Sequence, residues 1–213
     1  MDLFGIPGDL VGLILGWLLG LFTPIIAGRF QRERDRRELV AAIRAELGEL
    51  RITMAMVAHE FQERLGPLDD EFLDWLIVAL TEYPGGDPEL PKYVSALQAF
   101  RALPLSARPR RPRVASEATL LQQYRLPFLE ANLTRLGICS IPFQQGVINV
   151  KRTLDNFNGD TTSMLGYFEK TFDSSIGPNY KVVQANLDRA YPKALRTAKH
   201  LVDQVGRLLA NGT

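Results

Sequence analysis

The chain has 213 residues, of which 46% are hydrophobic and 23% are charged, and its formal net charge is +1. This balance excludes a disordered chain, which would be polar and strongly charged, and it gives no whole-chain argument for nucleic-acid binding. The single cysteine, Cys139, excludes a disulfide scaffold and any metal site built from several cysteines. The length is that of one ordinary domain with room for an appendage.

An uncharged apolar run lies near the start of the chain. From Leu10 to Gly28 the sequence reads LVGLILGWLLGLFTPIIAG, which is 19 residues without a charge. A helix of that length spans roughly 28 Å, close to the roughly 30 Å hydrocarbon core of a bilayer. A cleaved signal peptide is disfavoured, because the preceding flank holds Asp2 and Asp9 but no Lys or Arg. Residues 1–28 are therefore predicted to be an uncleaved membrane anchor; the alternative is a buried helix of a soluble protein.

Glycines recur at every fourth position of this segment, at Gly8, Gly12, Gly16 and Gly20. This spacing keeps them near one face of a helix. A face without side chains lets a second transmembrane helix approach closely. The pattern predicts helix packing in the membrane and a homo-oligomer, with a neutral groove facing lipid as the alternative.

Basic residues follow the apolar run directly, at Arg29, Arg32, Arg34, Arg36 and Arg37. Because Lys and Arg close to the membrane favour the cytoplasmic side, we expect an inner (plasma) membrane protein with its N-terminus outside and residues 29–213 in the cytoplasm. The same arginines are predicted to contact anionic lipid. The alternative is a solvated helix in which they form ion pairs with acids three or four residues away.

A helical stripe of apolar residues continues beyond the arginines. Steps of three and four predict that residues 29–66 form a basic juxtamembrane region and one long connector helix. The stripe consists of Leu39, Ile43, Leu47, Leu50, Met54, Val57, Phe61 and Leu65. This helix is expected to join the bundle formed by residues 67–213.

Two shorter helices are predicted next, over about 69–83 and 91–103. Asp69, Asp70 and Glu71 suit the N-terminus of the first, where carboxylates cap free amides and complement the dipole. The interior of that helix is apolar on nearly every side, so we expect it to be buried or to lie on a membrane or a partner. The second is expected to turn Tyr93, Leu97 and Phe100 inward.

The segment 103–116 combines three prolines with four arginines, Arg108, Arg110, Arg111 and Arg113. The prolines exclude a regular helix, which predicts an exposed loop; the alternative is a docking site for an acidic partner. No aromatic residue lies between Phe100 and Tyr124, and nucleic-acid binding is disfavoured because base stacking needs such residues.

The rest of the chain is predicted to be helical. One helix begins at Ser116, is interrupted by Pro127 and ends at Gly137. Two long helices, over about 140–174 and 178–209, form an antiparallel hairpin with coiled-coil-like packing. The predicted stripes are Phe143, Val147, Val150, Leu154, Phe157, Thr161, Met164 and Phe168 in the first helix, and Val183, Leu187, Tyr191, Leu195, Ala198, Val202, Val205 and Leu209 in the second.

No catalytic motif, phosphate-binding loop or cofactor motif is present in the sequence. His59 and Glu63 share a helix face but lack the further ligands that a metal centre needs. Residues 60–90 hold nine acids and one base, whereas residues 101–125 hold six arginines and one acid. These blocks are expected to pair within the fold, to pair between copies, or to recruit a charged partner.

The sequence therefore predicts an all-α fold with a single N-terminal transmembrane helix followed by a cytoplasmic bundle of long antiparallel helices. This layout is that of a bacterial single-pass membrane protein. The expected function is that of an interaction or scaffold protein, not an enzyme, with no cofactor, no metal and no catalytic residues. Its expected partners are membrane lipids, further copies of itself and an unidentified protein. The alternatives are an oligomeric membrane effector or pore component, and an enzyme that a pocket with convergent polar groups would favour.

Overall fold

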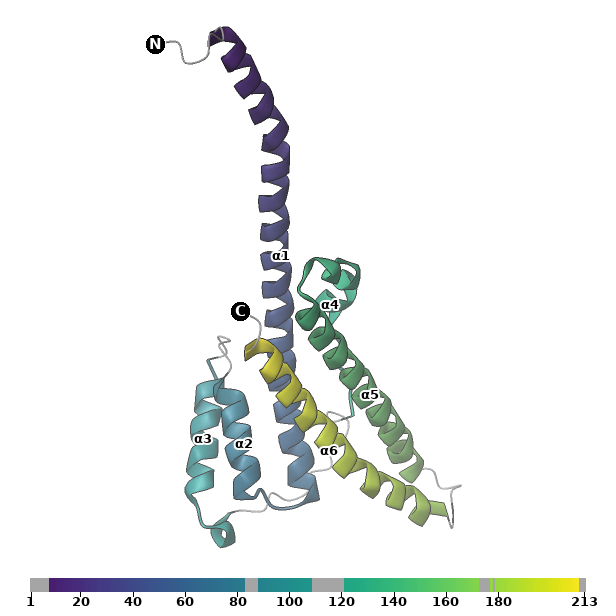
Figure 1. The fold of residues 1–213 in the computed structure, drawn as a ribbon. Helices are drawn as coiled ribbons and strands as arrows, with labels where there is room; N and C mark the ends of the chain where they lie inside the picture. Colours follow the sequence, from purple (N-terminus) through teal and green to yellow (C-terminus); the bar gives the residue numbers. More distant parts are fainter. Residues whose placement is uncertain (1–7, 83–87, 109–120, 173–176, 178, 211–213) are drawn as a thin grey trace. The chain divides into compact units, whose positions relative to one another are not determined.

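The computed structural model describes residues 8–82, 88–108, 121–172, 177 and 179–210, and for residues 8–11, 14, 15, 18 and 24–26 it describes the backbone alone. Every regular element in these ranges is helical (Figure 1). The chain divides between residues 42 and 43 into two units. The all-α expectation is confirmed for the described residues.

The first unit contains the start of helix α1, which runs from Gly8 to Leu65 over 58 residues. The helix includes the apolar run and the basic segment. Among the side chains that are described, no helical stretch is both long and apolar enough to cross a membrane. Eight side chains of the run Leu10–Gly28, at 10, 11, 14, 15, 18 and 24–26, lie outside the described side chains.

The second unit is built around the end of α1, from Ile43 onward. The predicted stripe is confirmed here, because its six members up to Phe61 are buried: Ile43, Leu47, Leu50, Met54, Val57 and Phe61. The expectation fails only at Leu65, which is 40% exposed. Leu65 is the last residue of the helix, where the chain turns away.

Helices α2 (Asp70–Thr81) and α3 (Leu90–Ala102) pack against each other. Asp69 is the N-cap of α2, and its carboxylate accepts a hydrogen bond from the Phe72 amide at 2.8 Å, as predicted. One face of α2 is buried, with Phe72, Leu73, Leu76, Ala79 and Leu80 inside. Val78 is 53% exposed, so burial within this chain is confirmed for one face of α2 only.

The helix predicted from Ser116 differs from the structure. Residues 116–120 lie outside the described residues, and residues 121–126 are not helical. Helix α4 spans only Pro127–Asn132, and the 3-10 helix η3 follows over Leu133–Ile138. The physical reason is Pro127, since a proline disfavours helical geometry in the residue before it, and Leu126 accordingly has φ −120° and ψ 73°.

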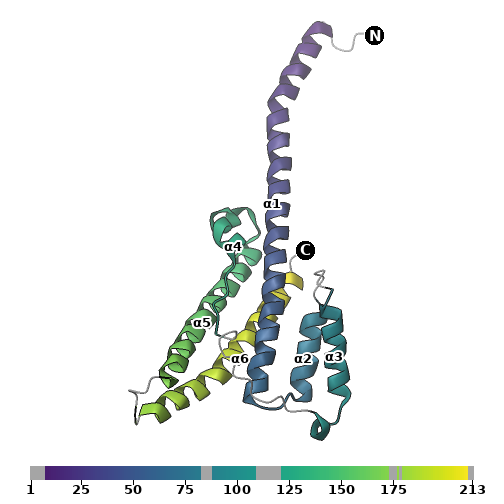
Figure 2. The same cartoon turned by 180° about the vertical axis from the view of Figure 1, so that it is seen from behind.

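Helices α5 (Ile141–Thr171) and α6 (Tyr180–Ala210) form the predicted hairpin. They pack side by side in both views (Figures 1 and 2). Seven of the eight predicted stripe positions of α5 are buried: Phe143, Val147, Val150, Leu154, Phe157, Thr161 and Met164. The ring of Phe61 on α1 lies 6.4 Å from that of Phe157 and 5.9 Å from that of Tyr191. The end of α1 is thus the third helix of this bundle, as expected.

Candidate functional site

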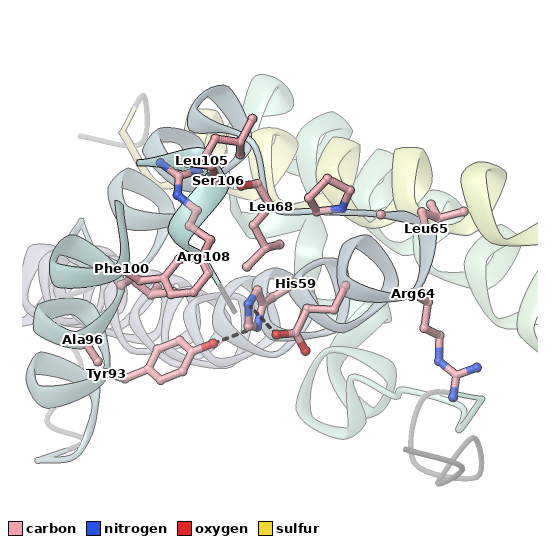
Figure 3. Close-up of a pocket in the computed structure, with 14 residues that line it drawn as sticks. His59, Arg64, Leu65, Leu68, Tyr93, Ala96, Phe100, Leu105, Ser106 and Arg108 are labelled. Atoms are coloured by element: carbon pink, nitrogen blue, oxygen red, sulfur yellow. Dashed lines mark hydrogen bonds and ion pairs between the residues drawn. The ribbon is translucent and has the colours of Figure 1, made fainter. Parts of the chain in front are cut away.

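A cavity of about 1020 Å³ lies in the second unit, between the end of α1, helix α3 and the segment that follows α3 (Figure 3). Its volume is at the upper end of the range typical of small-molecule sites. Apolar side chains form much of its wall, with polar groups among them. The lining residues are His59, Glu63, Arg64, Leu65, Gly66, Pro67, Leu68, Tyr93, Ala96, Leu97, Phe100, Leu105, Ser106 and Arg108.

Three polar side chains converge on one side of this cavity (Figure 3). His59 is buried, and its Nδ1 shares a hydrogen bond of 2.8 Å with the Tyr93 hydroxyl. On the other side of the ring, Nε2 lies 3.7 Å from a carboxylate oxygen of Glu63, one helical turn along α1. The imidazole also stacks on Phe72, with ring centroids 6.5 Å apart. The arrangement places a carboxylate, an imidazole and a phenol next to one another, and a hydrogen bond joins the imidazole to the phenol. Side chains of these three types act as general acids and bases in catalytic sites.

Arg108 is buried rather than exposed, so the expectation of an exposed loop is wrong at this residue. Its Nη1 donates to the Leu68 carbonyl at 2.8 Å, and its Nε donates to the Leu103 carbonyl at 3.2 Å. Its Nη2 donates to the Arg101 carbonyl at 3.0 Å and to the Asp70 carboxylate. Four of the five guanidinium N–H groups are therefore used inside the chain. The predicted docking residues Arg110, Arg111 and Arg113 lie outside the described residues.

The acidic and basic blocks meet within the fold at the α2–α3 contact. Arg101 lies 3.0 Å from an oxygen of Asp70 and 2.9 Å from an oxygen of Asp74. The hydrogen bond from Arg101 lowers the pKa of Asp74, and the same bond raises the pKa of Arg101. Of the three readings that the sequence left open, pairing within one chain is confirmed for these residues.

In the described part of the chain, no group of three or more His, Cys, Asp or Glu side chains is placed to hold a metal ion, at His59 and Glu63 or elsewhere. Cys139 is a free cysteine and is buried, as is usual for a thiol that packs as a small apolar side chain.

The predicted glycine face lies on α1 in the first unit. A Cβ atom added to Gly12, Gly16 or Gly20 would meet no heavy atom within 4 Å, whereas the surroundings of Gly8 lie outside the described side chains. Large apolar side chains near these glycines are exposed: Leu13, Trp17, Leu19, Leu21 and Phe22. Nothing described in this chain packs on that face.

The five predicted lipid-contacting arginines fall into two groups. Glu33 accepts hydrogen bonds from Arg36 at 2.9 and 3.0 Å and from Arg37 at 2.8 Å, and these bonds, that of Arg36 first, lower the pKa of Glu33. Arg34 pairs with Glu38 at 2.8 Å. The alternative of intrahelical ion pairs is thus confirmed for three of the five arginines.

Arg29 and Arg32 form the second group. Both are exposed. Within the described residues neither side chain has an ion pair or a hydrogen bond. The two arginines closest to the apolar run are therefore the ones whose charge is not matched by a neighbouring acid.

The cavity and its polar group are not among the features predicted from the sequence. The spacing of His59 and Glu63 was visible, but Tyr93 was interpreted only as an inward-facing residue of its helix. The available signal was that an inward tyrosine needs a partner for its hydroxyl. No sequence rule places that partner 34 residues earlier in the chain.

In comparisons with known proteins, no family model, no curated protein and no solved structure matches this chain.

Proposed function

We propose that the protein is a single-pass, membrane-anchored interaction module whose helical domain faces the cytoplasm. The observation that carries the proposal is the uncharged run Leu10–Gly28, which forms one continuous part of α1. Its described apolar side chains, including Leu13, Trp17 and Leu19, are exposed. In water each such side chain would forgo about 1.5–3 kcal/mol of burial, and a lipid environment removes that cost.

The orientation follows from the arginines that succeed the run. No Lys or Arg precedes the run, whereas five arginines lie within residues 29–37. The bias towards positive charge on the cytoplasmic side supports an N-terminus outside and the helical domain inside, at the inner (plasma) membrane. Extraction of membranes with alkaline carbonate tests the anchor, because an integral protein stays in the pellet and a peripheral one is released.

Self-association through the glycine face is the second part of the proposal. Among the described residues, no heavy atom lies within 4 Å of the position that a Cβ atom would take at Gly12, Gly16 or Gly20. Without a hydrophobic drive between helices in lipid, close packing of such surfaces is what favours association. A second copy of the chain fits this surface, because the glycine faces of two identical helices can then pack directly against each other.

The glycine face is tested in a reporter of transmembrane helix association. Gly12→Ile with Gly16→Ile should abolish the signal, because the isoleucines fill the groove. Ile14→Leu with Leu18→Ile is the matched control, since these positions lie about 200° further round the helix and should keep the signal. An unchanged signal in the glycine variant would refute self-association through this face. A large oligomer that makes liposomes leak, in place of a dimer that does not, would favour a pore component.

The cavity favours a second candidate function, a ligand-binding or catalytic domain on the same bundle. Its volume and the convergence of His59, Glu63 and Tyr93 are the features expected of such a site. Native mass spectrometry of the full chain should then detect a small molecule that co-purifies. Ala96→Trp, in the cavity wall, should remove it, and Ala102→Trp, at the exposed end of α3, should keep it. A purified protein without a bound mass would count against this candidate.

A further inference from the structure

We propose that Arg29 and Arg32 form a binding site for the headgroups of anionic phospholipids, and that Arg34, Arg36 and Arg37 take no part in it. This inference rests on the proposed membrane anchor. It divides the basic segment into two arginines that bind lipid and three that stabilise the helix. Two independent observations support the division.

The first observation is the distribution of charge along the helix. Residues 29–38 contain five arginines and three acids, and all the acids lie after Arg32, at Glu33, Asp35 and Glu38. Glu38 forms an ion pair with Arg34, and Glu33 forms ion pairs with Arg36 and Arg37. Asp35 accepts a hydrogen bond of 2.8 Å from Gln31. The excess of two positive charges therefore resides at Arg29 and Arg32.

The second observation is depth. Bilayer dimensions leave a headgroup layer of roughly 5–7 Å on each side of the hydrocarbon core. With a rise of about 1.5 Å per residue, and with Gly28 at the edge of the core, Arg29 lies about 1.5 Å and Arg32 about 6 Å beyond that edge. On the same scale Arg34 lies about 9 Å, and Arg36 and Arg37 about 12 Å or more, beyond that edge. The backbone of the first two arginines therefore lies within the headgroup layer along a helix close to the membrane normal, whereas the backbone of the other three lies outside it.

The chemistry of the side chain suits the ligand. A guanidinium group offers a planar fork of N–H donors that matches phosphate oxygens in two-point contacts. Arg29 and Arg32 are three residues apart, so both groups project from neighbouring points of one helix face. Phe30 lies between them in sequence and is 74% exposed, so its ring can enter the boundary of the hydrocarbon core. Phosphatidylglycerol, with one unbalanced negative charge, is the headgroup class that this surface selects over zwitterionic phosphatidylcholine.

The experiment measures lipid selectivity around the full chain in phosphatidylcholine vesicles. Spin-labelled phosphatidylglycerol and spin-labelled phosphatidylcholine are added in turn, and the fraction of each immobilised by the protein is compared. The wild-type chain should prefer phosphatidylglycerol, by about fivefold for each arginine at low salt. Raising the salt to 1 M, where the screening length is about 3 Å, should greatly reduce the preference.

Two double variants with equal loss of charge separate the two groups of arginines. Arg29→Gln with Arg32→Gln should abolish the preference for phosphatidylglycerol. Arg34→Gln with Arg37→Gln should retain it, because those side chains are paired with acids and lie further from the membrane. Equal losses in the two variants would overturn the proposal, because net charge alone would then explain the selectivity. A wild-type chain without any preference would overturn it as well.

Failure of the anchor itself is distinguishable from failure of this site. If the wild-type chain is released from neutral phosphatidylcholine vesicles by alkaline carbonate, the membrane anchor is wrong and the lipid site falls with it. If the chain resists extraction but shows no selectivity, the anchor stands and only the headgroup site is refuted.

Discussion

The side chain of Asn158 satisfies both backbone polar groups of Tyr124. Its Nδ2 donates to the Tyr124 carbonyl at 2.7 Å, and its Oδ1 accepts from the Tyr124 amide at 2.9 Å. Tyr124 lies in the non-helical segment 121–126, so its partly buried backbone groups need a partner outside that segment. One amide on α5 thus fixes an irregular segment that lies 34 residues away in the chain.

Asn158→Ala is expected to destabilise the protein by about 1–3 kcal/mol, because it leaves a partly buried amide and carbonyl of Tyr124 without partners. Equilibrium unfolding of the full chain in detergent, followed by circular dichroism, measures the loss. Asn156→Ala is the matched control, since Asn156 lies on the same helix and is exposed, and its effect should stay within about 0.5 kcal/mol. Equal effects of the two substitutions would contradict this role of Asn158.

Arg108→Met is expected to cost about 2–3 kcal/mol of stability. The substitution removes the donors of the carbonyl groups of Leu68 and Leu103, and hydrogen bonds from a charged group contribute about 1.5–3 kcal/mol. The bond to Asp70 adds little, because the Asp70 side chain is 56% exposed.

Arg108→Lys should recover only part of that loss, because an ammonium group cannot reproduce the planar fork of a guanidinium. Arg125→Met serves as the control, since Arg125 is exposed and its one ion pair within the described residues is with Glu130. Similar melting temperatures for the Arg108 and Arg125 variants would show that the buried guanidinium does not hold this segment.

Much of the bundle was predictable because its helices bury one face each. In such a helix every third or fourth position faces the core. The stripe from Ile43 to Phe61 and the stripe of α5 could therefore be derived from the spacing of apolar residues alone. The cap of α2 was predictable for a similar reason, since Asp69 acts on an amide only three residues ahead. These features could be predicted because each depends on residues that are close together in the sequence.

The features that could not be predicted from the sequence depend on contacts between residues that are far apart in the chain. The continuous helix through Asn158 was predictable, but no spacing in the sequence indicates that its side chain binds the backbone of Tyr124. Arg108 was expected to be exposed because its neighbours in sequence are prolines and arginines. In the structure it is buried, and it donates hydrogen bonds to carbonyl groups of other segments. The contact between His59 and Tyr93 likewise joins α1 to α3. Such partners are set by the tertiary arrangement of the helices, which no single segment encodes.

The contact between α2 and α3 is expected to weaken in acid. Because Arg101 lowers the pKa of Asp74 below its ordinary value of 3.8, the folded state binds fewer protons than the unfolded state near that pH. The stabilisation is therefore present above about pH 4 and is lost as the pH falls further, through the lowered pKa. At low pH the free energy of unfolding of the Asp74→Asn variant should equal that of the wild type. Near neutral pH it should be slightly lower than that of the wild type. Parallel stability curves of the two proteins across this range would disprove the coupling.

Two glycines of α5 should respond differently to alanine. Gly159 lies inside the helix, and a Cβ atom there would meet nothing within 4 Å, so Gly159→Ala should raise stability by about 0.5–1 kcal/mol through the lower entropy of the unfolded chain. At Gly146 a Cβ atom would lie 2.6 Å from Cδ1 of Leu208 on α6. The end of this half-buried leucine side chain must move, and the cost of that movement offsets the gain from alanine.

The comparison between these two variants tests the α5–α6 contact itself. Gly146→Ala should be less stable than Gly159→Ala, by up to about 1 kcal/mol, in chemical denaturation of the full chain. Adding Leu208→Ala to Gly146→Ala removes the clashing methyl groups, so the double variant should be more stable than the sum of the two single effects. Additive effects would mean that Gly146 and Leu208 do not meet, and the register between α5 and α6 would then be wrong.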